Sequence, residues 1–169
     1  MAAGSTYTPI ATTTLGSASN SVSFSSIAGT YTDLILVATG KNSTGFDGID
    51  IRVGNGSLDT GSNYSQTMLN GNGTSAQSSR DSNATSMTNM GITSSSTEQV
   101  SIYHFMNYAN TTTYKTVLAR SNVSDFRVAA IVGLWRSTSA INTIQLRSDN
   151  ASYNFTTGST FTLYGILSA

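Results

Sequence analysis

Residues 128–166 read VAAIVGLWRSTSAINTIQLRSDNASYNFTTGSTFTLYGI, and this stretch decides the fold class. It contains three short apolar runs that are separated by segments rich in Ser, Thr, Asn and Gly, residues that favour turns. Each run has the length of a β-strand and is too short for an ordinary helix. We therefore predict strands at residues 128–135, 141–146 and 160–166.

The same stretch holds the only tryptophan of the chain and the closing sequence Leu163-Tyr164-Gly165-Ile166. Large apolar side chains on predicted strands are the usual contents of a protein core. We therefore predict that the core is built around six residues of this stretch: Trp135, Leu134, Phe161, Leu163, Tyr164 and Ile166.

Upstream of this stretch the apolar patterns also have the spacing of strands. Residues 34–38 are apolar at every position, which predicts a central strand that is covered on both faces. Residues 100–108 likewise carry apolar side chains at both odd and even positions, and hence on both faces of the predicted strand. Residues 49–53 alternate instead, which predicts that Asp50 and Arg52 point into water.

The middle of the chain gives a weaker signal. Residues 54–86 contain few large apolar side chains, and Tyr64 and Met68 have a spacing that allows one helical turn. We predict long loops with poorly defined short strands here. Because long loops in a compact domain commonly carry function, Tyr64 is the predicted ligand-binding residue.

Together these patterns predict an all-β fold with little or no helix. Turn signals every 8 to 15 residues favour an antiparallel β-sandwich of the jelly-roll kind, with about eight to ten strands. The length of 169 residues suits one domain, which we place at residues 7–169 after a short N-terminal arm at residues 1–6.

The composition argues against several classes of partner. Eight basic residues balance eight acidic ones, so the chain lacks the positive field that attracts nucleic acid or anionic membranes. Only 9% of residues are charged, while 28 Ser, 26 Thr and 14 Asn supply a neutral polar surface. The N-terminus lacks the pattern of a secretory signal, and no apolar run is long enough for a membrane helix.

The residues offer little for catalysis. There is no Cys, and the sole histidine, His104, lies within a predicted strand, where a hydrogen-bonded core or interface role is favoured. Most of the eight acidic residues fall at predicted turns, which disfavours a glycosidase without excluding one. We therefore predict no catalytic residue, no enzyme activity and no cofactor.

The predicted loops also contain carboxylate and amide oxygens of the kind that calcium accepts. Asp47 and Asp50 flank Gly48, and Asn42 and Asn55 lie in adjoining predicted turns. No EF-hand spacing is present, so ordinary turn residues are the favoured interpretation and no metal site is predicted.

Three segments carry a resemblance to a known family. They are Tyr7-Thr8-Pro9-Ile10-Ala11-Thr12-Thr13-Thr14-Leu15, then Gly133-Leu134-Trp135-Arg136-Ser137-Thr138 with Ile141 and Ile144, and finally Gly158-Ser159-Thr160-Phe161-Thr162-Leu163-Tyr164-Gly165-Ile166. As a set they resemble small β-sandwich domains of tailed-bacteriophage structural proteins, which are found at tail-fibre tips and among capsid decoration proteins. No catalytic or ligand-binding role comes with these positions.

The resemblance implies a non-enzymatic virion protein that is assembled in the host cytoplasm. Its partners would be two further copies in a homotrimer and other capsid or tail proteins. Only six residues precede Tyr7, which favours a protein that decorates or stabilises the capsid. The alternative is a tail-fibre tip that adheres to a host-surface glycan or protein.

Overall fold

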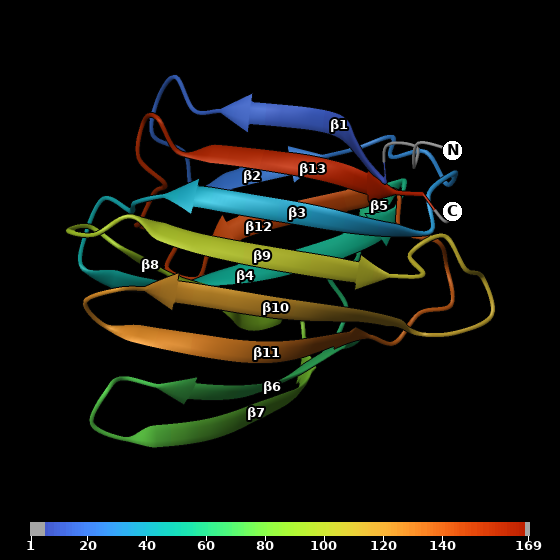
Figure 1. Ribbon diagram of the computed structural model, residues 1–169. Coiled ribbons are helices and arrows are strands. Elements are labelled where there is room, and N and C mark those ends of the chain that lie inside the picture. The colour runs from blue at the N-terminus through green and yellow to red at the C-terminus, as the bar shows by residue number, and fades with distance from the viewer. Residues whose placement is uncertain (1–5, 168–169) are drawn as a thin grey trace, which may run out of the picture.

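The computed structural model describes residues 6–167, which form two antiparallel β-sheets packed face to face (Figure 1). The prediction of an all-β antiparallel sandwich is confirmed. Across the described residues there is no helix, so none could cross a membrane. Apart from Thr6, the predicted N-terminal arm lies outside the described residues.

The larger sheet contains eight strands. Their order is β1 (Tyr7–Thr14), β13 (Thr160–Ile166), β3 (Asp33–Gly40), β9 (Gln99–Met106), β10 (Lys115–Val123), β11 (Arg127–Trp135), β6 (Tyr64–Gly71) and β7 (Ala76–Ala84). The chain therefore places β13 between β1 and β3, so that its last strand separates two strands from its first quarter.

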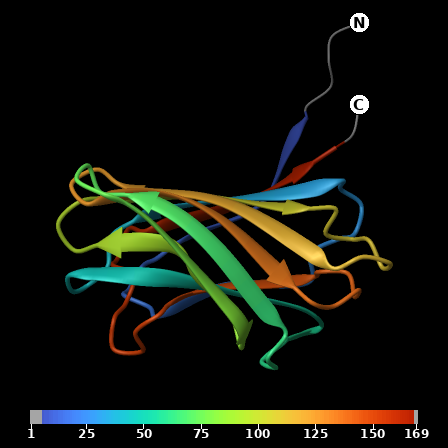
Figure 2. The same ribbon diagram turned by 90° about the horizontal axis from the view of Figure 1, so that it is seen from below.

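The smaller sheet contains five strands. Their order is β2 (Ser21–Phe24), β12 (Thr143–Ser148), β4 (Phe46–Asn55) and β5 (Ser57–Leu58), and β8 (Met87–Ser94) also pairs with β4. A minimal jelly roll divides eight strands equally between its sheets, whereas here the sheets are unequal. Figure 2 shows the two layers, with β6 and β7 running obliquely across one side of the sandwich.

The strands beyond the expected eight to ten come from the middle of the chain. Residues 64–71 and 76–84 form the hairpin β6–β7 in place of the predicted loops and helical turn. The side chain of Asn72 accepts hydrogen bonds from the backbone N–H groups of Thr74 and Ser75, and Gly73 adopts a positive φ of 84°. These two residues close the turn and set the register of the hairpin.

The core lies between the sheets. On β9, for example, Tyr103 and Phe105 point inward and are fully buried against the smaller sheet. Gly133 on β11 permits a close approach of β8, because a Cβ atom there would lie 2.5 Å from Met87 Sδ. A larger residue at position 133 would therefore require the flexible side chains of Met87 and Met90 to move.

Only half of the six predicted core residues belong to this core. Trp135, Phe161 and Leu163 are buried between the sheets, with exposed fractions of 3%, 0% and 0%. Leu134, Tyr164 and Ile166 are half-buried on the opposite face of the larger sheet, so their assignment to the core was wrong. The reason is the period of two in a strand, which sends adjacent side chains to opposite faces.

Candidate functional site

The larger sheet has an outer face that none of the described residues, 6–167, covers. Side chains of alternate residues point there, away from the smaller sheet. We define the outer face by its principal apolar residues: Tyr7, Ile35, Leu69, Ile102, Leu118, Val128, Val132 and Ile166.

Several of these side chains are exposed to an extent that is unusual for aliphatic residues in a strand. Val128 is 61% exposed, Leu69 60% and Leu118 45%. They come from the adjacent strands β6, β10 and β11, so their exposed carbon atoms form one surface instead of isolated spots. Because large contiguous apolar surfaces are a common feature of interaction sites, this face is the candidate functional site.

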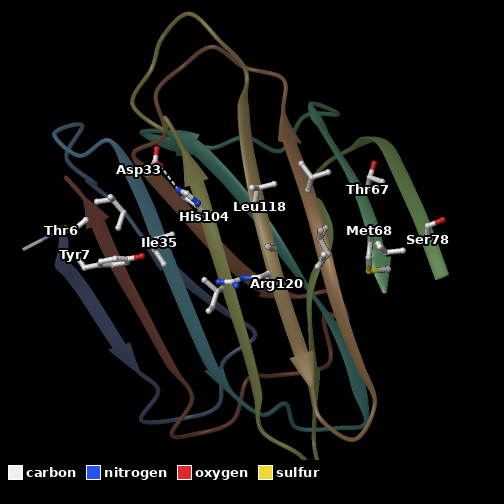
Figure 3. A pocket seen from close by; sticks show the side chains of 17 residues that line it. Thr6, Tyr7, Asp33, Ile35, Thr67, Met68, Ser78, His104, Leu118 and Arg120 are labelled. Carbon is white, nitrogen blue, oxygen red and sulfur yellow. Dashed lines mark hydrogen bonds and ion pairs between the residues drawn. The ribbon is translucent and has the colours of Figure 1, made fainter. Parts of the chain in front are cut away.

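The outer face is hollowed. One depression of about 770 Å³ runs from Tyr7 and Ile166 to Leu69, and Figure 3 shows the side chains that line it. A second depression of about 530 Å³ continues from it towards Val128, and both are lined by Leu69 and Arg120. The two depressions therefore form a continuous concave surface across the sheet.

Charged groups on this surface are few. His104 Nε2 lies 2.7 Å from Asp33 Oδ2, and the other oxygen of Asp33 accepts a hydrogen bond of 2.7 Å from the backbone N–H of Asn107. Arg120 projects from the neighbouring strand β10 (Figure 3). A half-exposed pair of this kind contributes about 0–1 kcal/mol to stability.

The His104–Asp33 pair resembles two members of a catalytic triad but has no nucleophile. In the part of the chain that the structure describes, no hydroxyl group is hydrogen-bonded to His104. The surrounding side chains are aliphatic and open to solvent, so they create no enclosed polar pocket. The arrangement suits contact with an apolar partner better than general acid–base chemistry.

The predicted ligand-binding residue Tyr64 is not on the surface. It is fully buried at the start of β6, and its hydroxyl bonds to the backbone of Val53 and to the carbonyl of Asp59. Burial raises the pKa of Tyr64 to about 12. The assignment to an exposed loop was therefore wrong, and Tyr64 ties β6 to β4 and to the segment that follows β5.

Asp50 also differs from its prediction. It is fully buried instead of pointing into water, because it lies at a register shift between β4 and β8, where residues 86–89 and the Arg147 side chain enclose its carboxylate. Its carboxylate accepts hydrogen bonds from the Ser86 hydroxyl at 2.9 Å and the Asn89 N–H at 3.2 Å, and pairs with Arg147 at 2.8 Å. Burial raises the pKa of Asp50, and the nearby Asp149 raises it further against these hydrogen bonds.

Asp47 lies near the same cluster, where burial raises its pKa although the Ser148 hydroxyl and the Asn150 N–H donate to it. The two carboxylates considered for a calcium site, Asp47 and Asp50, thus form internal hydrogen bonds. Within residues 6–167, no three acidic or histidine side chains are arranged to hold a metal ion.

No protein-family model matches the chain, and no curated protein matches it. The signal for the outer face was present in the sequence, because β3, β9 and β11 carry apolar side chains on both parities. Only the structure reveals that one of the two faces has no cover from the part of the chain that it describes.

Proposed function

We propose that this chain is a non-enzymatic structural protein on the outer surface of a tailed-phage particle, where it forms a homotrimer and decorates or stabilises the capsid. The observation that carries the proposal is the exposed aliphatic surface on the outer face of the larger sheet. Copies of the chain associate there and remove the exposed carbon atoms from water.

A second copy suits this surface better than a sugar or a nucleic acid does. The exposed side chains at its centre, Leu69, Leu118 and Val132, are aliphatic and offer no aromatic ring for stacking. Asp33 and Arg120 carry opposite charges on the same face, so identical copies meet without net repulsion. The resemblance to trimeric phage domains supports three copies.

Sedimentation velocity of the purified chain tests the assembly. We expect a species of three times the chain mass of 17.7 kDa. The double variant Leu118→Lys/Val132→Lys places two positive charges on the outer face and should yield the monomer. Ser23→Lys adds a charge at an exposed position of the smaller sheet and should remain trimeric.

A wild-type chain that stays monomeric at all concentrations would contradict the proposal, as would an outer-face variant that assembles normally. Binding to purified phage particles then tests the location. Capsids lacking tails should bind the chain if it is a decoration protein. Binding to isolated tails alone would favour the alternative, a receptor-binding tail-fibre tip.

A further inference from the structure

A second exposed surface lies at one end of the sandwich. Phe46 begins β4 in the smaller sheet, and Phe126 closes the turn between β10 and β11 in the larger sheet. Their ring centroids are 4.0 Å apart with an interplanar angle of 20°, so the two rings stack. The pair therefore bridges the two sheets at the end opposite the start of β1 and the end of β13 (Figure 1).

Both rings remain open to solvent, with exposed fractions of 45% for Phe46 and 36% for Phe126. Phenylalanine has no polar atom that would benefit from this exposure. Turns ordinarily carry small polar residues, and the turn residue before Phe126 is Asp125. Turn formation does not require an aromatic residue here, and the stacking of the two rings on each other still leaves much of their surface in water.

A cation without a carboxylate partner lies beside the rings. The Cζ atom of Arg127 is 5.7 Å from the centroid of the Phe126 ring. Arg127 Nε is enclosed by protein and donates no hydrogen bond, and none of the described residues forms an ion pair with this side chain. Burial lowers the pKa of Arg127. The Arg127 side chain as a whole is half-exposed, so an acidic group of a ligand would pair with the terminal nitrogens of its guanidinium and not with the enclosed Nε.

Hydrogen-bonding groups lie in the segments that carry the aromatic pair and in the segment that contacts them. The Thr97 hydroxyl donates to Asp125 Oδ2 at 2.6 Å and holds this carboxylate in place. Ser95 Oγ accepts a hydrogen bond from the backbone N–H of Gly45, the residue before Phe46. A carboxylate, hydroxyl groups and an arginine therefore lie around two exposed rings, and we call these residues the tip cluster: Phe46, Thr97, Asp125, Phe126 and Arg127.

We propose that the tip cluster binds a carbohydrate that carries carboxylate groups. The C–H face of a sugar ring packs on the exposed phenylalanine rings and removes apolar carbon from water. The sugar carboxylate pairs with Arg127, and Asp125 accepts hydrogen bonds from sugar hydroxyls. The aliphatic outer face offers none of these groups at its centre, so the two surfaces select different partners.

This inference does not depend on assembly, although a trimer would present three tip clusters and raise the apparent affinity for a polymer by avidity. The chemistry common to uronic and sialic acids is a pyranose ring that carries a carboxylate. Both classes therefore serve as probes, and a neutral polysaccharide of similar size serves as the control.

Isothermal titration calorimetry of the full chain with oligogalacturonate and with oligosialic acid tests the proposal. We expect binding to at least one of the two, with an affinity that falls as salt rises because salt screens the ion pair. Dextran should not bind measurably. Absence of binding to both acidic probes, or equal binding to dextran, would overturn the proposal.

Variants locate the site. Phe126→Ala should weaken binding of the acidic probe at least about tenfold, and Arg127→Gln should do the same by removing the charged partner. Tyr114→Ala removes an aromatic side chain that is 55% exposed just before β10, and Arg80→Gln removes an exposed cation on β7. Both control variants should bind as the wild type does.

Phe46→Ala provides a second test from the smaller sheet in case Phe126→Ala disturbs the fold. Thermal unfolding checks that each variant is native, and sedimentation velocity checks that its assembly is unchanged. Unaltered binding in folded Phe46, Phe126 and Arg127 variants would place the glycan elsewhere and refute the assignment. The monomeric outer-face variant should keep the affinity of a single site, which separates this inference from the proposed assembly.

Discussion

The two faces of β9 carry similar side chains in different surroundings. Tyr103 and Phe105 point inward and are fully buried, whereas Val100 and Ile102 point outward, and Val100 is 36% exposed. The same contrast recurs on β10 and β11. Both faces are apolar, but the smaller sheet covers only one of them. Side chains on the covered face stabilise the fold, whereas side chains on the outer face are available for association.

The largest difference in stability is expected between substitutions of a buried and of a partly exposed carboxylate. Asp50→Ala removes the buried partner of Arg147 and should lower the free energy of unfolding by about 3–5 kcal/mol. Asp33→Ala breaks the half-exposed pair with His104 and should cost about 1 kcal/mol or less. Urea denaturation measures both, and equal losses would contradict the distinction between covered and open faces.

Two leucines, one on each face, allow the same stability test for apolar side chains. Leu36 is fully buried on the inner face of β3, so Leu36→Ala should cost about 2–5 kcal/mol. Leu118 is 45% exposed on the outer face, and Leu118→Ala should change the stability of the monomer by about 0.5 kcal/mol or less. The measurement should use the monomeric state, because assembly adds its own free energy to the unfolding transition.

Two tyrosines allow a test of how much a buried and a partly exposed hydroxyl group contribute to stability. Tyr64→Phe leaves the buried backbone N–H of Val53 without its partner and should cost about 1–3 kcal/mol. Tyr164, which is half-buried on the outer face, provides the matched variant Tyr164→Phe, with an expected change near zero. If Tyr64→Phe also proved neutral, the hydroxyl would have no structural role at this position.

The smallest expected effect is the change in stability with pH. Because the pKa of Asp50 is raised in the native state, the folded chain holds this proton at a pH where the unfolded chain has lost it. The stability of the wild type relative to Asp50→Asn should therefore fall as pH rises from about 4 through the raised pKa. Urea denaturation between pH 4 and 7 measures the difference.

For Asp59 we expect the opposite pH dependence of stability. Burial would raise its pKa, but hydrogen bonds from Trp135, Asn63 and the backbone N–H of Gly61 together hold the pKa below its ordinary value. Asp59 therefore stabilises the folded chain above the unfolded pKa of about 4, and this stabilisation is lost as pH falls through the lowered pKa of the native state. The stability of the wild type relative to Asp59→Asn should therefore fall on acidification.

The sequence predicted the fold class because strand periodicity is local. It could not separate Phe161 and Leu163 from Tyr164 and Ile166, since apolar residues on both parities do not tell which face the chain covers. The strand β7 was missed because nearly all of its residues are exposed and polar, and only pairing with β6 defines it. The burial of Tyr64 and Asp50 depends on contacts with distant segments.

The candidate surfaces differ in how far the sequence could indicate them. The double-sided pattern of residues 34–38 and 100–108 already required a cover on each face, so the outer face was visible in part. The tip cluster was not, because Phe46 and Phe126 are eighty positions apart in the chain and meet only where the two sheets end together. Neither residue belongs to an apolar run.

The position of β13 has a consequence for the order of folding. Thr14 and Thr160, which lie on paired strands, are 146 residues apart in the sequence. During synthesis β1 and β3 emerge early, yet both lack this neighbour until the last strand has left the ribosome. We expect closure of the larger sheet to be slow, because a long loop must be ordered first. Until then the free edge of β3 can pair with another nascent chain, so the rate of translation should influence the yield of native protein.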